Sequence, residues 1–222
     1  MTLMDSRSNA YRKLFRSGLV LVLLFVGYGL FLINRSGSGG SGAPRTAPLP
    51  VLRTISSMDL VDQEGEPVNL QTFRGQPWFA NIIFTRCPGP CARMTQKMRQ
   101  LQEALPAEAS EVQLVSLTTD PDFDTPEVLS QYARKFQADI RSWKFLTGTK
   151  EEIVRVSTQE WLLVMLEKGE AERESPNDIF LHSTLTVLMD GLGRIRGTYE
   201  ILEEGQLEEA LADLQRLLQE AS

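Results

Sequence analysis

The chain has 222 residues, a length that accommodates one ordinary domain plus additional segments. Hydrophobic residues make up 42% of it, which is enough for a packed core and excludes a largely disordered chain. The net charge of −6 argues against a nucleic-acid-binding protein, which usually carries a basic face. The first 35 residues hold five basic residues and one acid, a net charge of +4 that leaves −10 for the rest. This asymmetry predicts that the two parts occupy different environments.

The first predicted element is a transmembrane helix over residues 14–34. Its apolar run, residues 14–33, is about 30 Å long as a helix, which matches the hydrocarbon core of a bilayer. Basic residues cluster before and at the start of this run: Arg7, Arg12, Lys13 and Arg16. The positive-inside rule therefore predicts a single-pass protein of the inner (cell) membrane, with residues 1–13 in the cytoplasm and the main domain on the periplasmic side. The alternative is a signal peptide that is cleaved within residues 36–43.

Residues 35–54 are predicted to be a flexible linker. Gly, Ser and Pro dominate this stretch and no hydrophobic periodicity is present, a composition that an artificial linker would share. Residues 36–50 would reach about 20 Å as a random coil. The linker would let the following domain, residues 55–222, move over the membrane surface and meet partners embedded there.

The domain after the linker shows the element order of an α/β fold. Buried strands are predicted over residues 78–84, 112–117 and 143–146, and a hairpin joins strands over 183–190 and 194–199. Helices are predicted over 87–105, 125–136, 150–157 and 207–218, the second with Thr125 as its N-cap. This order predicts a thioredoxin-like central sheet flanked by helices.

The two cysteines of the chain, Cys87 and Cys91, lie where a predicted strand ends and a helix begins. Four residues apart on a helical turn, they would share one face, so both sulfurs could contact one ion or each other. The positive end of the helix would favour thiolate over thiol, and Arg86 and Arg93 would add to that effect. A disulfide closing so short a loop would stabilise little, so the pattern predicts a redox or metal role.

His182 is the one histidine of the chain and the candidate third ligand. A single histidine is more often an ordinary core or surface residue than a ligand, but this one precedes a predicted strand and is the one imidazole that could join the cysteines. Two thiolates and an imidazole suit Cu(I), whereas structural zinc usually takes four protein ligands. The residues therefore make Cys87, Cys91 and His182 candidate copper ligands, with the oxidation state, Cu(I) or Cu(II), left open.

Three segments resemble the Sco/SenC family in the expected order. They are Phe84-Thr85-Arg86-Cys87-Pro88-Gly89-Pro90-Cys91 with Met94-Thr95, then Ser116 to Pro121 with Asp124 to Leu129, then His182-Ser183 with Leu188-Met189-Asp190 and Gly193 to Gly197. The resemblance runs from about Leu49 to the C-terminus and includes the anchor topology. It implies a thioredoxin fold, with Cys87, Cys91 and His182 as copper ligands. It further implies a metallochaperone that delivers copper to the dinuclear copper centre of cytochrome c oxidase, or reduces that centre's cysteines. Another periplasmic copper protein is the other candidate recipient, and the domain is expected to be monomeric.

One position departs from the family pattern, because Leu181 stands where many members carry Asp before the histidine. Asp178, one turn earlier, is a candidate to orient the imidazole instead. Three other sets of residues fit structural roles better than functional ones. Met94 and Met98 fit core packing better than copper ligation, Trp78 and Trp161 fit the core, and Asp120, Asp122 and Asp124 fit a solvated turn better than a calcium loop.

Two alternatives to the copper interpretation remain. The first is a copper-independent thiol–disulfide oxidoreductase, in which Cys87 and Cys91 would be the catalytic pair. The Cys-x-x-x-Cys spacing and the lack of any proline after Pro176 distinguish the chain from general thioredoxins. The second is an interaction domain with incidental cysteines, which their position at a strand–helix junction disfavours.

Overall fold

The computed structural model describes residues 47–105 and 112–220. The predicted transmembrane helix over residues 14–34 lies outside them. Within these two described ranges, no helix is both long and apolar enough to cross a membrane. The packed unit begins at Pro48. Its first strand, β1 (Arg53–Thr54), falls inside the stretch 35–54 that the composition predicts as linker.

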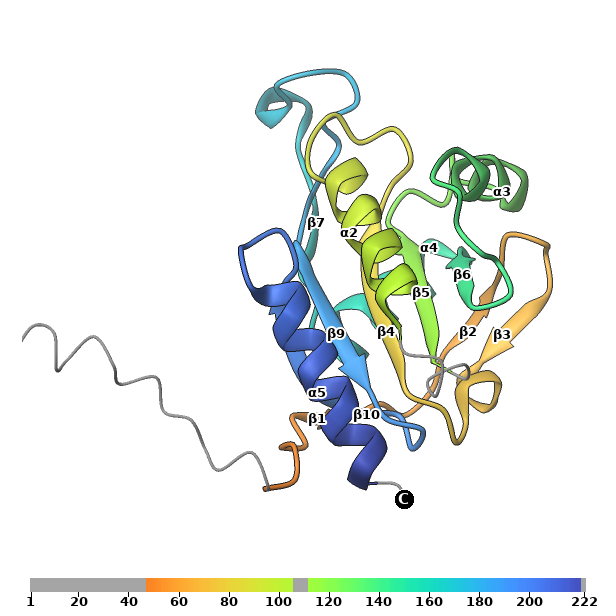
Figure 1. Ribbon diagram of the computed structural model, residues 1–222. Helices are drawn as coiled ribbons and strands as arrows, with labels where there is room; N and C mark the ends of the chain where they lie inside the picture. The colour runs from red at the N-terminus through yellow and green to blue at the C-terminus, as the bar shows by residue number, and fades with distance from the viewer. Residues whose placement is uncertain (1–46, 106–111, 221–222) are drawn as a thin grey trace, which may run out of the picture. The chain divides into compact units, whose positions relative to one another are not determined.

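A six-stranded mixed sheet forms the centre of the domain, with the strand order β1-β10-β9-β4-β5-β6 (Figure 1). The parallel strands are β4 (Trp78–Ile83), β5 (Gln113–Thr118) and β6 (Trp143–Leu146). The hairpin β9 (Leu185–Met189) and β10 (Arg194–Glu200) joins the sheet because β9 pairs antiparallel with β4. The predicted strands are confirmed to within about two residues at their ends.

The described residues form four α-helices around the sheet: α2 (Cys91–Ala104), α3 (Pro126–Lys135), α4 (Lys150–Val154) and α5 (Gln206–Glu220). In Figure 1, α2 and α5 lie side by side over one face of the sheet. The predicted cap of α3 is confirmed, because the Thr125 side chain accepts a hydrogen bond from the Val128 N–H and Pro126 takes the first helical position. The π-helical segment η3 (Arg155–Glu160) continues α4.

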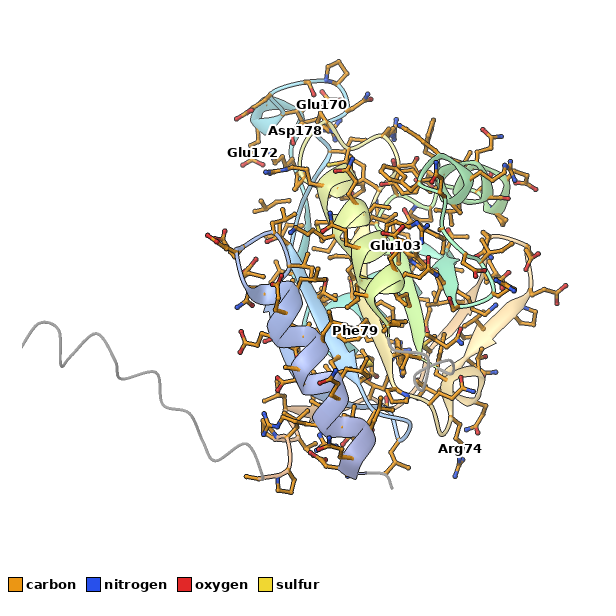
Figure 2. All side chains as sticks on the ribbon, in the orientation of Figure 1. Arg74, Phe79, Glu103, Glu170, Glu172 and Asp178 are labelled. Carbon is orange, nitrogen blue, oxygen red and sulfur yellow. The ribbon has the colours of Figure 1, made fainter. Side chains whose placement is uncertain are left out.

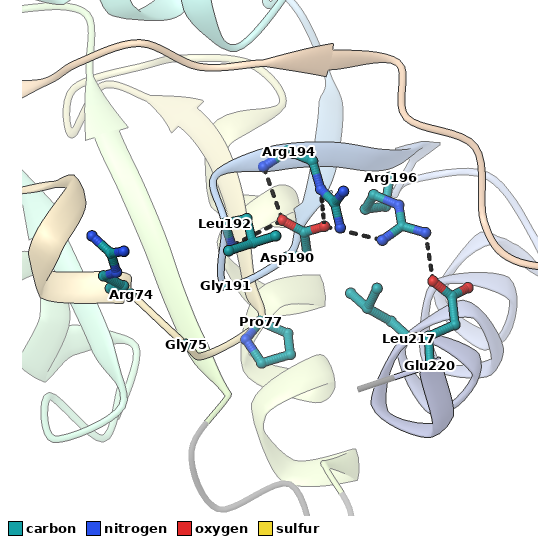
Figure 3. A pocket seen from close by; sticks show the side chains of 10 residues that line it. All are labelled: Arg74, Gly75, Pro77, Asp190, Gly191, Leu192, Arg194, Arg196, Leu217 and Glu220. Carbon is teal, nitrogen blue, oxygen red and sulfur yellow. Dashed lines mark hydrogen bonds and ion pairs between the residues drawn. The ribbon is translucent and has the colours of Figure 1, made fainter. Parts of the chain in front are cut away.

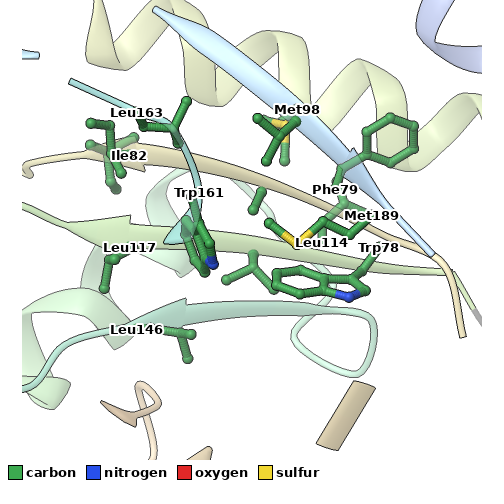
Figure 4. Close-up of a cluster of buried hydrophobic side chains, with 14 of the residues drawn as sticks. Trp78, Phe79, Ile82, Met98, Leu114, Leu117, Leu146, Trp161, Leu163 and Met189 are labelled. Carbon is green, nitrogen blue, oxygen red and sulfur yellow. The ribbon is translucent and has the colours of Figure 1, made fainter. Parts of the chain in front are cut away.

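The core occupies both faces of the sheet because every residue of β4 is buried. Figure 4 shows Phe79 and Met98 on the α2 side of the strands, and Trp78 and Trp161 on the other side. The Trp78 and Trp161 rings meet edge to face, with centroids 5.7 Å apart. Met94 and Met98 are fully buried, which confirms the core interpretation of both methionines.

The helix predicted from residue 87 begins instead at Cys91, with Pro90 as its N-cap. The cause is local, since a residue before proline is disfavoured in helical conformation, and Cys87 and Gly89 each precede one. The two cysteines therefore do not share a helical turn. Cys87 lies in the loop of residues 84–90, hereafter the cysteine loop, and Cys91 opens α2.

Two small sheets were not predicted from the sequence. One pairs β2 (Asp59–Val61) with β3 (Pro67–Asn69), and the short helix η1 (Leu70–Phe73) follows. The other pairs β7 (Met165–Glu167) with β8 (Phe180–His182) around the short helix η4 (Glu170–Glu172). Strands of three residues are too short to show a period of two above background. The second sheet matters for the site because its last residue is His182.

Candidate functional site

The cysteine loop brings both sulfurs to the carboxyl end of β4. The Cys87 N–H donates to the Phe84 carbonyl oxygen (3.2 Å), which folds the loop into a tight turn. The Gly89 N–H then donates to the Cys87 Sγ (3.3 Å), and the Phe84 N–H donates to the Cys91 Sγ (3.5 Å). Both cysteines carry reduced thiols. The sequence predicted that a shared helical face would bring the two thiols together. In the structure, this turn does so instead.

Burial separates the two thiols chemically. Cys91 is only 1% exposed, whereas Cys87 is partly exposed. Burial raises the pKa of the Cys91 thiol well above its usual range, and a hydrogen bond to Cys87 raises it further. The expectation that the helix N-terminus favours thiolate over thiol is therefore wrong for Cys91, whose pKa desolvation raises. Arg86 does not counter this, since its guanidinium pairs with Asp120 (2.7 Å).

Two acidic residues that follow β5 accept hydrogen bonds from the cysteine loop. Asp120 and Asp124 are 4% and 0% exposed, so the solvated turn predicted for residues 120–124 is wrong for these two and holds for Asp122. Asp124 accepts hydrogen bonds from Thr85 in the cysteine loop and from Thr118 at the end of β5. The sequence signal was a set of polar residues directly after a buried strand, beside the edge that carries the cysteines.

A pocket of about 400 Å³ opens beside Cys87. Its walls come from the cysteine loop and from the β7–β8 segment, with Phe84, Cys87, Pro88, Gly89, Pro90, Lys168, Glu174, Ser175, Asp178, Phe180 and Leu181 as lining residues. The two walls meet where the rings of Phe84 and Phe180 pack edge to face, with centroids 5.5 Å apart. Figure 2 shows Asp178 with Glu170 and Glu172 at this end of the domain.

The backbone of His182 ends β8, where it pairs with Met165. The structure thus brings the strand that carries His182 to the pocket beside Cys87. The side chain of His182 is not among the described parts of the chain, so its approach to the sulfurs stays a prediction. Asp178, the candidate to orient the imidazole, accepts two hydrogen bonds from the Lys168 Nζ (2.9 and 2.7 Å). Across the described residues, no three His, Cys, Asp or Glu side chains form a ready metal cluster.

A second pocket of about 400 Å³ lies at the opposite end of β4, beside Pro77 (Figure 3). Its charged side chains largely neutralise one another, because Asp190 pairs with Arg194 and Arg196, and Arg196 also pairs with Glu220. It is far along the sheet from the cysteines, and its charges serve to fasten the hairpin to α5. We therefore place the functional site at the cysteine loop.

Fold and site together define a thioredoxin-like domain with a thiol pair at the end of its central strand. The chain belongs to the SCO1/SenC family, whose model matches residues 48–219. The solved structure of a SCO1/SenC family lipoprotein from Bacillus anthracis is 29% identical, with a TM-score of 0.69 over 78% of this chain and 99% of that chain. The predicted thioredoxin-like fold is confirmed.

Two further solved structures are similar over most of the domain. ScoI from Bradyrhizobium japonicum, solved with copper bound, is 25% identical, with a TM-score of 0.62 over 74% of this chain and 99% of that chain. BsSco, described as a Sco-family cytochrome c oxidase assembly protein with a disulfide switch, is 26% identical, with a TM-score of 0.65 over 77% of this chain and 98% of that chain.

Proposed function

We propose that this protein is a membrane-anchored, copper-binding and thiol-active assembly factor for the copper centre of cytochrome c oxidase. Its role would be either to deliver copper to that centre, with copper as its cargo, or to reduce the cysteines of that centre. The observation that carries the proposal is the contact between the thiols of Cys87 and Cys91, beside a pocket whose other wall includes the strand that ends at His182. The copper-bound ScoI and the assembly role of BsSco support the same assignment.

The donor set fits copper. Two soft sulfur ligands and an imidazole suit Cu(I) or Cu(II), and three protein ligands leave a position through which the ion could pass to a recipient. Residue 182 ends β8, the strand whose Phe180 ring contacts Phe84 in the cysteine loop. These placements support His182 as the third ligand.

Because Cys91 is buried, copper binding at this residue is coupled to the release of a proton. The raised pKa keeps this thiol protonated at neutral pH in the metal-free protein, so ligation must release its proton. Apparent copper affinity therefore rises with pH. This coupling would favour release of copper where a recipient supplies thiolates of ordinary pKa.

The membrane part of the proposal rests on the sequence. Residues 14–34 would anchor the protein in the inner membrane with the domain on the periplasmic side, where the copper centre of the oxidase is also expected. The linker would supply the reach between the anchor and a membrane-embedded recipient.

A copper-independent thiol–disulfide oxidoreductase is the second candidate, because Cys87 is partly exposed and Cys91 is buried. In that reaction the Cys87 sulfur attacks a partner disulfide and forms a mixed disulfide, and the partner's second sulfur leaves as a thiolate. Cys91 then attacks the Cys87 sulfur, forms the Cys87–Cys91 disulfide and releases the partner as a dithiol. Two electrons pass from the protein to its partner.

Copper titration of the purified protein separates the two candidates. We expect one copper ion per chain, and an affinity lower by on the order of 100-fold in His182→Ala. Leu181→Ala is the matched control, because Leu181 neighbours the histidine and is 56% exposed. Full copper affinity in His182→Ala would contradict the three-ligand site, and disulfide turnover in protein that takes up no copper would favour the oxidoreductase.

A further inference from the structure

The residues directly before Cys87 are attached to the segment that connects β5 to α3. The Thr85 N–H donates to the Asp124 Oδ2 (3.0 Å), and the Thr85 hydroxyl donates to the other oxygen of the same carboxylate. The Thr118 hydroxyl, at the end of β5, also donates to the Asp124 Oδ2. One buried carboxylate thus ties the cysteine loop to the neighbouring strand.

Arg86 makes a second attachment to the same segment. Its Nε donates to the Asp120 carboxylate (2.7 Å), and its guanidinium lies over the Phe123 ring, 4.6 Å from the centroid. Asp120 is in turn held by its own N–H, which donates to the Thr118 hydroxyl (3.0 Å). The two residues that precede Cys87 therefore both have fixed partners, which restrict the position of Cys87.

A purely local role does not explain Asp124. It does not cap α3, since the Thr125 side chain takes that position. Burial raises the pKa of Asp124, which shows that the carboxylate loses solvation free energy at this site. Its donors come from the cysteine loop and from the end of β5, so the compensating hydrogen bonds act between elements.

We propose that Asp124 is a positioning residue that holds Cys87 against Cys91 through the Thr85 backbone, and that it thereby sets both the disulfide equilibrium of the pair and its copper affinity. The copper part rests on the proposed function. The thiol part does not, because the pair can be oxidised without metal. In a glutathione buffer, the two thiols give two protons and two electrons to glutathione disulfide, which yields the Cys87–Cys91 disulfide and two glutathione thiols.

Three variants of the full chain test the proposal. Asp124→Ala removes all three acceptor contacts. Asp124→Asn keeps the shape, because its amide oxygen can accept from the Thr85 N–H and the Thr118 hydroxyl while its NH₂ donates to the Thr85 hydroxyl. Asp122→Ala is the matched control, since it removes an exposed carboxylate from the same turn.

In Asp124→Ala, we expect the equilibrium constant for disulfide formation to fall about tenfold, which corresponds to about 30 mV. Copper affinity should fall at least tenfold, as is typical when a residue that orients a ligand is lost. Asp124→Asn should recover most of both losses, and Asp122→Ala should match the wild type. Circular dichroism verifies that each variant is folded.

Wild-type behaviour of Asp124→Ala in both measurements would overturn the proposal. Equal losses in Asp124→Asn and Asp124→Ala would also overturn it, because the charge would then matter and the hydrogen bonds would not. If Asp124→Ala does not fold, Thr85→Val removes one donor and should lower the disulfide constant about threefold; an unchanged constant would refute the role. If the wild type binds no copper while the disulfide constant falls as expected, the proposed function fails and the positioning role stands.

Discussion

Arg196 offers the sharpest test of how the domain is held together. The pairing of β10 with β9 shifts register between Ile195 and Gly197, and this β-bulge turns Arg196 inward, so that its side chain is only 5% exposed. Its guanidinium donates to Asp190 (3.0 Å) and Glu220 (2.6 Å) (Figure 3). It also donates to the carbonyl oxygens of Leu49 (2.6 Å) and Pro50 (3.1 Å). One side chain thus joins the β9–β10 hairpin, α5 and the start of the packed unit.

The expected cost of Arg196→Met is at least about 3 kcal/mol. Methionine keeps the apolar stem, so the loss is that of the hydrogen bonds. The two carboxylate contacts contribute about 1.5 kcal/mol each, and the bonds to the Leu49 and Pro50 carbonyl oxygens add to this sum. The carboxylates are not left unpaired, because Asp190 keeps Arg194 and Glu220 keeps the Leu49 N–H. This places the loss at the lower end of the range for a broken buried ion pair.

Chemical denaturation followed by circular dichroism measures this loss, and the same change lowers Tm by about 6–12 °C for a domain of this size. Arg141→Met is the control, because Arg141 also makes two contacts to a carboxylate, Asp139, while its side chain is 87% exposed. The control should lose far less stability, because solvent screens an exposed ion pair. A loss below about 1 kcal/mol in Arg196→Met would refute the reasoning that burial gives this network its strength.

Three further outcomes follow from the described contacts. Gly191→Ala should destabilise the protein by about 3 kcal/mol or more in urea denaturation, because an added Cβ meets the backbone of residues 75–76, which cannot move aside as a side chain could. Iodoacetamide should label Cys87 at least about tenfold faster than Cys91 by peptide mass spectrometry, since thiolate is the reacting form and burial raises the Cys91 pKa; equal rates would contradict this. Burial likewise raises the pKa of Tyr199, so the folded state retains protons that the unfolded chain loses. The free energy of unfolding should therefore fall with pH by up to about 1.4 kcal/mol per pH unit above about pH 8.5 because of Cys91, and by up to as much again above about pH 10 because of Tyr199. Constant urea midpoints from about pH 8 to 11 would be inconsistent with this expectation.

Local sequence patterns were sufficient to predict the main strands of the central sheet. The continuous apolar run of β4 and the matching runs of β5 and β6 predicted buried strands, because a strand covered on both faces has no polar side to interrupt it. The Thr125-Pro126 pair likewise predicted the start of α3, since capping depends on a few adjacent residues. The neighbouring sequence was likewise sufficient to identify Cys87 and Cys91 as a pair at a strand–helix junction.

What the sequence alone determined about this protein is therefore its local architecture and the position of its thiols along the chain. The tertiary structure decided their chemistry, because burial raises the Cys91 pKa against the helix dipole that a local reading would favour. It also decided the roles of Asp124 and Arg196, because Asp124 binds Thr85, 39 positions away in the chain, and Arg196 binds Glu220 and Leu49, 24 and 147 positions away. Desolvation and partners distant in sequence arise only when separate elements pack together, so no pattern of neighbouring residues could have revealed them.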